Sequence, residues 1–223
     1  MQRLRHDKMR FTLCHENQIA KCSPFRRGCV SFPPMSWLIF AMLLVPCAVL
    51  LVLELRGVKT TLSLHMRGDI SRESKFLAQY GQAICTPIVA LLVWQLDKTN
   101  PGHRALIILF STIAASASAA GLKRLLGRSR HNRRHAGQFL GPTWTHANWR
   151  ESFPSSHSAC AMAMSVPLAM FYPSAAITFF SLAILTAALR YVLDAHWPSD
   201  VLAGLALGYL CAIVILELFA RLA

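Results

Sequence analysis

Long apolar runs alternate with short polar segments along most of this chain. The first run covers residues 36–55 and reads SWLIFAMLLVPCAVLLVLEL, which is about the 20 residues that a helix needs to cross the hydrocarbon core of a bilayer. We therefore predict an all-α protein, a bundle of six transmembrane helices with both termini on one side of the membrane. The other five predicted spans cover about 76–96, 105–126, 156–172, 175–193 and 200–219.

Two of these runs are less uniformly apolar than the others. The run at 76–96 includes Gln79 and Gln82, so we expect one of its ends to face protein or the membrane interface. The run at 105–126 is rich in small residues, among them Ser111, Ser116 and Gly121. Small residues let helices approach closely in lipid, which predicts a position inside the bundle.

The chain divides into a basic tail and a membrane domain. Residues 1–35 hold seven Lys or Arg against Asp7 and Glu16 and end at Pro33-Pro34. We expect a flexible cytosolic tail there, although a start at Met35 is an alternative. Residues 36–223 form the predicted membrane domain, with an active-site loop at 127–157. A cleaved signal peptide is less consistent with the first run, because no small-x-small cleavage site follows it.

Composition narrows the class of protein. The chain is 54% hydrophobic and 15% charged, with a formal net charge of +13. Much of the basic charge lies between apolar blocks, which indicates anionic lipid headgroups and an anionic substrate rather than nucleic acid. The seven cysteines show neither an even count nor a C-x-x-C spacing, which argues against a disulfide framework. Free thiols in the tail fit a reducing cytosolic side.

Three polar segments next to the predicted spans carry the candidate chemistry. The first begins at Lys123 and ends at Arg130, seven positions later, and the second is Pro154-Ser155-Ser156-His157 at a helix start. The third holds Arg190, His196 and Asp200. In a bundle of six spans, the end of the third and fifth and the start of the fourth and sixth lie at one membrane face. The topology therefore predicts that these residues meet.

The residue types suit phosphoryl transfer, which requires positioning and charge stabilisation of the equatorial oxygens. Lys123, Arg130 and Arg190 would bind the phosphate, together with Ser155, Ser156 and the amides at the helix N-terminus. His196 would attack phosphorus, and Asp200 would fix its tautomer. His157 would protonate the leaving oxygen. The expected course is a phosphohistidine intermediate, which a water activated by His157 then hydrolyses.

These segments resemble the three signature motifs of the type 2 phosphatidic acid phosphatase superfamily. That family, also called lipid phosphate phosphatases, shares its site with vanadium haloperoxidases, and its pattern reads K-x6-R-P, P-S-G-H and S-R-x5-H-x3-D. The resemblance spans about residues 105–219 and implies the same roles as those given above. Three positions depart from the pattern: His131 replaces a proline, Ser156 a glycine and Leu189 a serine.

The resemblance implies a metal-independent membrane phosphatase without a cofactor. Its substrate would be a lipid phosphate monoester or diphosphate, and the candidates are an isoprenyl diphosphate, phosphatidic acid, phosphatidylglycerol phosphate and a lipid A type glycolipid. We expect a bacterial inner membrane location with the site on the periplasmic side and both termini in the cytosol. The count of Lys and Arg on the two sides does not decide this orientation.

Several alternatives stay open. The site could serve a lipid phosphotransferase, or a non-catalytic protein that only binds phosphate. A metal site at His157, His196 and Asp200 is disfavoured, because the surrounding cations would repel a metal ion. Each histidine taken singly could be structural. Two groups of loop residues have two interpretations each: Arg124 and Arg128 contact lipid headgroups or substrate, and His131, Arg133, Arg134 and His135 form a solvated loop or a second phosphate subsite. Trp144 and Trp149 could be interfacial aromatics, and Asp194 and Glu151 could be partners of the arginines.

Overall fold

A computed structural model describes residues 34–62, 68–82, 84–131, 135–143, 148–193 and 196–222. The described parts are helical apart from loops and one isolated bridge between Arg128 and Phe139, which confirms the predicted all-α class. The basic tail lies outside the described residues but for its last positions. The helices are α2 (Pro34–Leu55), α3 (Asp69–Leu77), α4 (Cys85–Leu96), α5 (Pro101–Leu126), α6 (Ser156–Phe171), α7 (Ala176–Val192) and α8 (Pro198–Leu222), with 3-10 turns η1 (Ala78–Gly81), η2 (Asn148–Arg150) and η3 (Pro173–Ala175).

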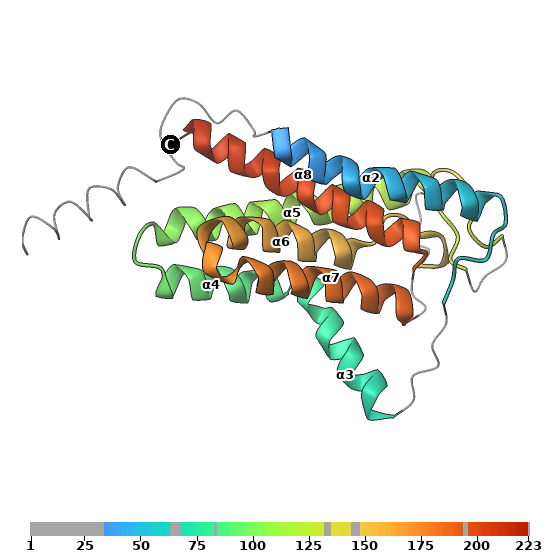
Figure 1. The fold of residues 1–223 in the computed structure, drawn as a ribbon, viewed down its shortest axis with the longest axis horizontal. Coiled ribbons are helices and arrows are strands. Elements are labelled where there is room, and N and C mark those ends of the chain that lie inside the picture. Colours follow the sequence, from blue (N-terminus) through green and yellow to red (C-terminus); the bar gives the residue numbers. More distant parts are fainter. Residues whose placement is uncertain are drawn as a thin grey trace, which may run out of the picture.

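Helix α6 forms the centre of the bundle, and α5, α7 and α8 pack around it (Figure 1). Every residue of α6 from Ser158 to Ala169 is buried. Helix α8 comes closest to α6, because two glycines face it. A Cβ atom at Gly204 would lie 2.4 Å from the carbonyl oxygen of Ser155, and one at Gly208 would lie 2.1 Å from that of Ala159.

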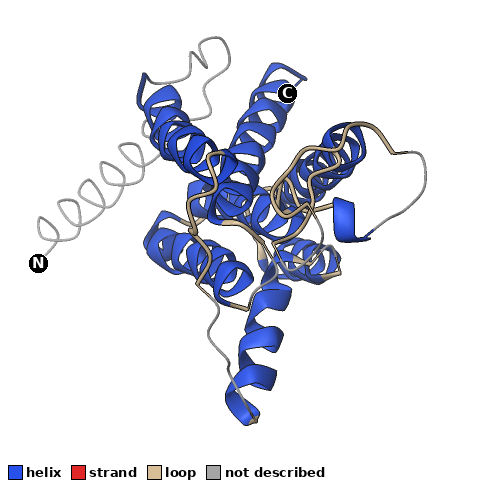
Figure 2. Cartoon of the chain, turned by 90° about the vertical axis from the view of Figure 1, so that its right-hand side faces the viewer, coloured by secondary structure: helices blue, strands red, loops and turns tan. Residues whose placement is uncertain are grey.

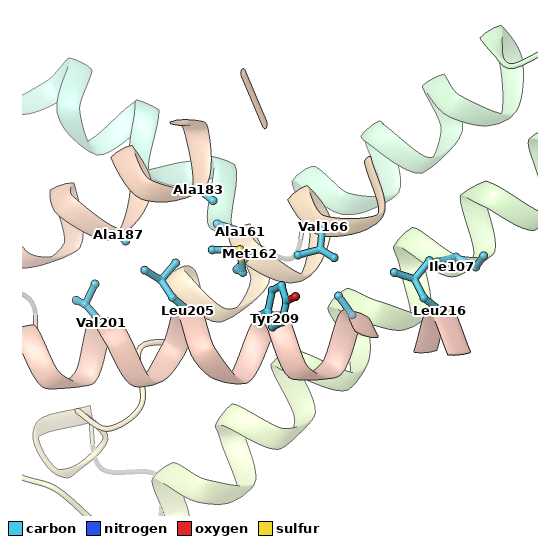
Figure 3. Packing of buried hydrophobic residues seen from close by; sticks show 11 residues of the cluster. Ile107, Ala161, Met162, Val166, Ala183, Ala187, Val201, Leu205, Tyr209 and Leu216 are labelled. Atoms are coloured by element: carbon cyan, nitrogen blue, oxygen red, sulfur yellow. The ribbon is translucent and has the colours of Figure 1, made fainter. Parts of the chain in front are cut away.

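The largest apolar cluster joins these helices around the middle of α8. Leu205 and Tyr209 of α8 pack against Met162 of α6, with Ala183 and Ala187 of α7 on one side (Figure 3). Ile107 of α5 and Leu216 of α8 extend the cluster towards the C-terminal end of α8. This packing fixes the relative positions of the helix ends from which the polar segments emerge.

Among the described residues, four helices are long and apolar enough to cross a membrane, or five if a bent pair counts as one span. The four are Trp37–Leu55, Pro101–Leu126, Pro173–Val192 and Pro198–Leu222, and the pair is Arg72–Gly81 with Cys85–Leu96, bent by 63°. The predicted fourth span is α6, which has only 16 residues and is therefore about 24 Å long. The prediction of six spans is thus confirmed only in part.

One expectation about single runs was wrong, and the expected position of α5 inside the bundle is confirmed for the side that packs on α4, α6 and α8. The run at 76–96 is not one helix, because the chain turns between η1 and α4. The small residues of α5 do not all face the bundle: Ser111 and Ala119 are buried, whereas Ala117 and Gly121 are exposed. Small residues occur all around α5, and only one of its faces packs on α6 and α8.

The polar segments gather at one end of the bundle. Helices α2, α5 and α7 end there, and α6 and α8 begin there, at the right of Figure 1. Figure 2 looks onto this end, where the loops that join the helices cross over the helix ends. The antiparallel order predicted from the sequence thus holds for the helices that carry the candidate site.

Candidate active site

The loop after α5 is held by main-chain hydrogen bonds. Gly127 ends the helix in the left-handed conformation, with φ of 58°, and its N–H donates to the carbonyl of Lys123. Such a C-cap favours glycine because a Cβ atom strains it. The Ser152 N–H then donates to the Arg128 carbonyl at 3.1 Å, and the Arg130 N–H donates to the Trp149 carbonyl at 3.0 Å. These bonds hold the two ends of the long loop side by side.

The first turn of α8 is joined to the start of α6. Pro198 opens the helix, where its fixed φ is favourable, and the Asp200 carboxylate accepts the Trp197 N–H at 3.1 Å. An acidic side chain that caps the amide three residues earlier is half of a capping box. The Asp200 carbonyl also accepts the Ser155 N–H at 2.9 Å. Asp200 therefore ties the beginnings of both helices together.

His196 lies just before α8 and is only 3% exposed. Its Nδ1 is 2.9 Å from the carbonyl oxygen of Ser152. A carbonyl can only accept, so Nδ1 carries the proton and the Nε2 lone pair is free. Asp200, which we expected to fix this tautomer, lies farther away, with 3.6 Å between its Oδ2 and Nδ1. The main chain orients the ring, and Asp200 acts on it through its charge.

Burial lowers the pKa of His196 to about 4, although the nearby Asp200 carboxylate opposes this shift. The imidazole is therefore neutral at pH 7, which is the form that can act as a nucleophile. Two cations, Lys123 and Arg190, also interact electrostatically with it and disfavour its protonation.

The structure brings the predicted site residues together, as the antiparallel helix order requires. His157 lies on the first turn of α6 and interacts electrostatically with residues of the two other polar segments, namely Arg190, His196, Lys123 and Arg130. Lys123 likewise interacts with Arg130, Asp200 and Arg190, and Arg190 interacts with Arg130. Residues separated by up to 77 positions thus form one cluster.

Two of the three predicted phosphate-binding cations have no protein anion bound to them. Within the described ranges, the side chains of Lys123 and Arg190 form no hydrogen bond or ion pair, and the Nε atom of Arg190 is buried without a partner. Lys123 and Arg190 are both half-buried, and cations that are shielded from much of the solvent are normally paired. Cations that repel one another around a buried imidazole therefore indicate an anion-binding site.

The helix start between them fits an anion less completely than expected. Ser155 is fully buried, and its N–H is already bonded to Asp200. Its hydroxyl accepts from the Ser158 hydroxyl at 3.1 Å and does not cap the helix. The first-turn amides, which begin at Ser156, thus have no capping side chain, and such amides are suitable donors to an anion.

Arg128 is not at the lipid or substrate surface, and both interpretations of it from the sequence were wrong. Its side chain is fully buried and forms ion pairs with Glu54 at 2.7 Å and Asp200 at 2.5 Å. The rings of Phe139, Phe153 and Trp197 surround it at 5.3, 5.9 and 5.3 Å. Sequence reasoning also missed Glu54, whose signal was present: a carboxylate at the end of an apolar span is costly unless paired.

The remaining predicted residues are placed as follows. Glu151 is buried and interacts electrostatically with Lys123. Trp149 is 41% exposed and lies beneath the Arg150 guanidinium, and His135 is exposed. His131 packs edge-on against Trp197, with ring centroids 5.9 Å apart. Arg133, Arg134, Trp144 and Asp194 lie outside the described residues.

Comparison with known proteins gives one family and two similar proteins. A model of the PAP2 superfamily matches residues 104–222. A lipid A 1-phosphatase of Rhizobium etli is 38% identical over 116 residues, which are 51% of this chain and 50% of that protein. A lipid A 1-phosphatase of Rhizobium johnstonii is 36% identical over 115 residues, or 51% and 47% of the two chains. The match thus spans about half the length of these relatives. No solved structure matches.

Proposed function

Because the chain belongs to the PAP2 superfamily, we propose that it is an integral-membrane lipid phosphatase that acts through a phosphohistidine at His196. The observation that carries this proposal is a pair of cations, Lys123 and Arg190, which form no hydrogen bond or ion pair with any described residue. They lie beside an imidazole whose Nδ1 donates to the Ser152 carbonyl. A site that only binds phosphate requires the cations. It does not require a buried neutral imidazole with a free Nε2.

The reaction follows from these positions. Lys123, Arg130 and Arg190 hold the three terminal phosphate oxygens, with amides of the first turn of α6 as further donors. The Nε2 lone pair of His196 forms a bond to phosphorus while the bond from phosphorus to the lipid oxygen breaks. That oxygen leaves with the bonding electrons and takes a proton from His157. The His196 ring is then cationic, with phosphorus on Nε2 and hydrogen on Nδ1.

A water completes the cycle. His157, which has given up its proton, accepts one from this water as its oxygen attacks phosphorus. The bond between phosphorus and Nε2 breaks, and its electrons return to the ring, which becomes neutral again. Inorganic phosphate leaves. No step consumes a metal ion or a cofactor, so we expect the activity to persist in EDTA.

We propose a phosphate monoester on a lipid A type glycolipid as the first substrate to test. The support is the name of the two relatives, both called lipid A 1-phosphatase, and their 36% and 38% identity to this chain. Isoprenyl diphosphate, phosphatidic acid and phosphatidylglycerol phosphate remain the other candidates, since all present a terminal phosphate that the same cations can bind.

We propose six membrane crossings, in which the bent α3–α4 segment and the buried α6 complete the set of four long helices. This arrangement is supported by the antiparallel order of α5 to α8 and by the exposed apolar side chains on the outward faces of α2, α4 and α7. We further propose that the site lies at the periplasmic surface of an inner membrane, with both termini in the cytosol, as expected from the resemblance and from the free thiols of the tail.

The test is phosphate release by the purified full-length protein in detergent, with and without EDTA, from the four lipid phosphates named above. We expect release from at least one of them in both buffers and none with His196→Ala. The control is His135→Asn, because His135 is exposed and its φ of 62° is tolerated by asparagine. Undiminished release by His196→Ala, or no release from any lipid by the wild type, would refute the proposal.

A further inference from the structure

A buried chain of charges connects the first apolar helix to His196. Arg128 donates from Nη2 to Glu54 Oε2 at 2.7 Å and from Nη1 to Asp200 Oδ1 at 2.5 Å. Nη1 also donates to the Ser199 hydroxyl at 2.7 Å, and that hydroxyl donates to Glu54. Asp200 in turn lies 3.6 Å from His196 Nδ1. All three charged side chains are fully buried.

The charges in this chain do not balance. Glu54 and Asp200 contribute two negative charges, and Arg128 contributes one positive charge. An arginine with one carboxylate partner usually binds it with two parallel hydrogen bonds. Here the two ends of the guanidinium go to different carboxylates, so Asp200 receives only one of them. The unbalanced negative charge on Asp200 acts on two neighbours, Lys123 and the imidazole of His196. Both interact electrostatically with Asp200.

The imbalance matches the charge that forms during the proposed reaction. The His196 ring is neutral before attack and cationic when it carries the phosphoryl group. A fixed buried anion at 3.6 Å stabilises the second form more than the first. If Arg128 were not shared with Glu54, both of its ends could bind Asp200, and less of the negative charge would remain for the ring.

We propose that Glu54 is a positioning residue that divides the charge of Arg128 between two carboxylates, so that Asp200 retains the negative charge needed by the phosphorylated imidazole of His196. This proposal rests on the proposed function. It makes the first apolar helix part of the catalytic machinery, although Glu54 lies outside the segment that the family model matches, 104–222.

A purely mechanical role for Glu54 is the competing explanation. Besides Arg128, the Glu54 carboxylate accepts the Ser199 N–H at 3.3 Å and the Thr60 hydroxyl at 3.2 Å. It thereby ties α2 to the start of α8. A mechanical role depends on the length of the Glu54 side chain, because the hydrogen bonds to α8 require it. The division of charge depends on the negative charge of Glu54.

Two substitutions separate these roles. Glu54→Gln keeps the length of the side chain and removes the charge, and Glu54→Asp keeps the charge and shortens the side chain. We expect Glu54→Gln to lower kcat by about 10- to 100-fold, the usual effect of losing a polar partner behind a functional imidazole, with KM within about threefold of the wild type. We expect Glu54→Asp to retain kcat within about fivefold while lowering the thermal midpoint.

Glu217→Gln is the matched control, because Glu217 forms an i,i+4 ion pair with the exposed Arg221 near the end of α8. It should leave kcat and KM unchanged. If Glu54→Gln has wild-type kcat, the proposal is wrong. It is also wrong if folded Glu54→Asp, which keeps the charge, loses about 10-fold or more in kcat. This second criterion uses Glu54→Asp alone and therefore decides the matter should Glu54→Gln fail to fold.

Anion binding provides a readout that does not depend on turnover. Orthovanadate can bond to an imidazole nitrogen and so place positive charge on the ring, whereas sulfate only fills the space between the cations. Measured by calorimetry on the full-length protein in detergent, Glu54→Gln should weaken vanadate binding about tenfold and change sulfate binding less than twofold. Equal effects on the two anions would overturn the proposal. A wild type that binds vanadate but hydrolyses no lipid phosphate would refute the proposed function alone.

Discussion

The imidazole of His196 donates its Nδ1 hydrogen to the backbone carbonyl of Ser152, 44 positions earlier in the chain, at 2.9 Å. The side-chain hydroxyl of Ser152 donates a second hydrogen bond, to the Asp200 carboxylate. Ser152 thus binds both the ring and the anion beside it, one through the main chain and the other through the side chain. Because the carbonyl belongs to the backbone, substitution of the side chain leaves the orientation of the ring intact.

This arrangement predicts that Asp200→Asn and Ser152→Ala have unequal effects. Asp200→Asn removes the charge beside His196 and should lower kcat by about 10- to 100-fold, with KM little changed. Ser152→Ala removes only one donor to Asp200, whose carboxylate still accepts from Arg128 and Trp197, so kcat should fall less than about fivefold. Steady-state kinetics on the best lipid substrate measures both. A Ser152→Ala variant as damaged as Asp200→Asn would show that the hydroxyl, not the carbonyl, sets the geometry.

The sequence predicted the outer members of this site better than its interior. Lys123, His157 and Arg190 were located from their spacing and from helix ends, because the ends and starts of successive antiparallel helices lie at the same end of a bundle. The contact between Ser152 and His196 was not predictable, since a main-chain carbonyl has no residue-type signature. Arg128 was misplaced for a related reason: in sequence it is one of several loop arginines, and only the fold shows Glu54 beside it.

The prediction of six spans is confirmed only in part, because the length of a helix and its burial do not always agree. Helix α6 is apolar enough for a membrane helix, but it has 16 residues and is covered by its neighbours. Hydropathy records that a residue avoids water and does not distinguish a lipid environment from a protein interior. The weak run at 76–96 was ambiguous in the same way, and the glutamine and glycine residues that lowered its hydropathy mark the turn between η1 and α4.

The low pKa of His196, about 4 and caused mainly by burial, predicts how stability depends on pH. Between pH 6.5 and 4 the unfolded chain binds a proton at this residue and the folded protein does not. Stability therefore falls as pH is lowered through this window, by about 3 kcal/mol from this residue, and the contribution is fully present above pH 6.5. His196→Asn lacks this dependence, so the difference between the thermal midpoints of wild type and variant should change between pH 7 and pH 4.5.

His135→Asn is the control for that measurement, since His135 is exposed. Its thermal midpoint should follow that of the wild type at every pH. A difference between wild type and His196→Asn that stays constant from pH 7 to pH 4.5 would mean that His196 titrates alike in the folded and unfolded chains.

The close packing around Gly81 predicts that η1, the 3-10 turn beside His157, does not tolerate a larger residue at this position. A Cβ atom at this position would lie 2.2 Å from the His157 carbonyl oxygen and 2.9 Å from Thr186 Cγ2. Gly81→Ala should therefore push η1 away from α6 and α7, cost about 1–3 kcal/mol of stability and lower kcat. Gly121→Ala is the matched control, because nothing lies within 4 Å of its Cβ position on α5. It should be neutral or stabilising by up to about 1 kcal/mol. Equal thermal midpoints for the two variants would contradict the packing.

The contacts of Asp97 predict that its substitution lowers the stability of the protein without lowering its activity. Asp97 lies in the turn between α4 and α5, at the opposite end of the bundle from His196, because α5 begins there and has 26 residues. Its carboxylate accepts Arg104 Nη1 at 2.5 Å, the Tyr172 hydroxyl at 2.6 Å and the Thr99 N–H at 2.7 Å. Burial raises the pKa of Asp97, but the hydrogen bonds from Tyr172, Thr99 and Arg104 outweigh this effect and lower it. The carboxylate therefore stabilises the fold at pH values above the ordinary pKa of an aspartate.

Asp97→Asn removes the charge that these donors share while keeping the size of the side chain. We expect it to cost about 1–3 kcal/mol, seen as a lower thermal midpoint at pH 7, and to leave kcat and KM unchanged. Below the pKa of Asp97 in the folded protein the carboxylate is neutral as well, so the gap between wild type and variant should narrow as pH falls towards that value. Asp69→Asn is the matched control, because the side chain of Asp69 is 85% exposed and forms an ion pair with the nearby Arg72. A surface pair of this kind contributes at most about 1 kcal/mol, so Asp69→Asn should keep the wild-type midpoint. A change in kcat for Asp97→Asn would show that the two ends of the bundle are coupled.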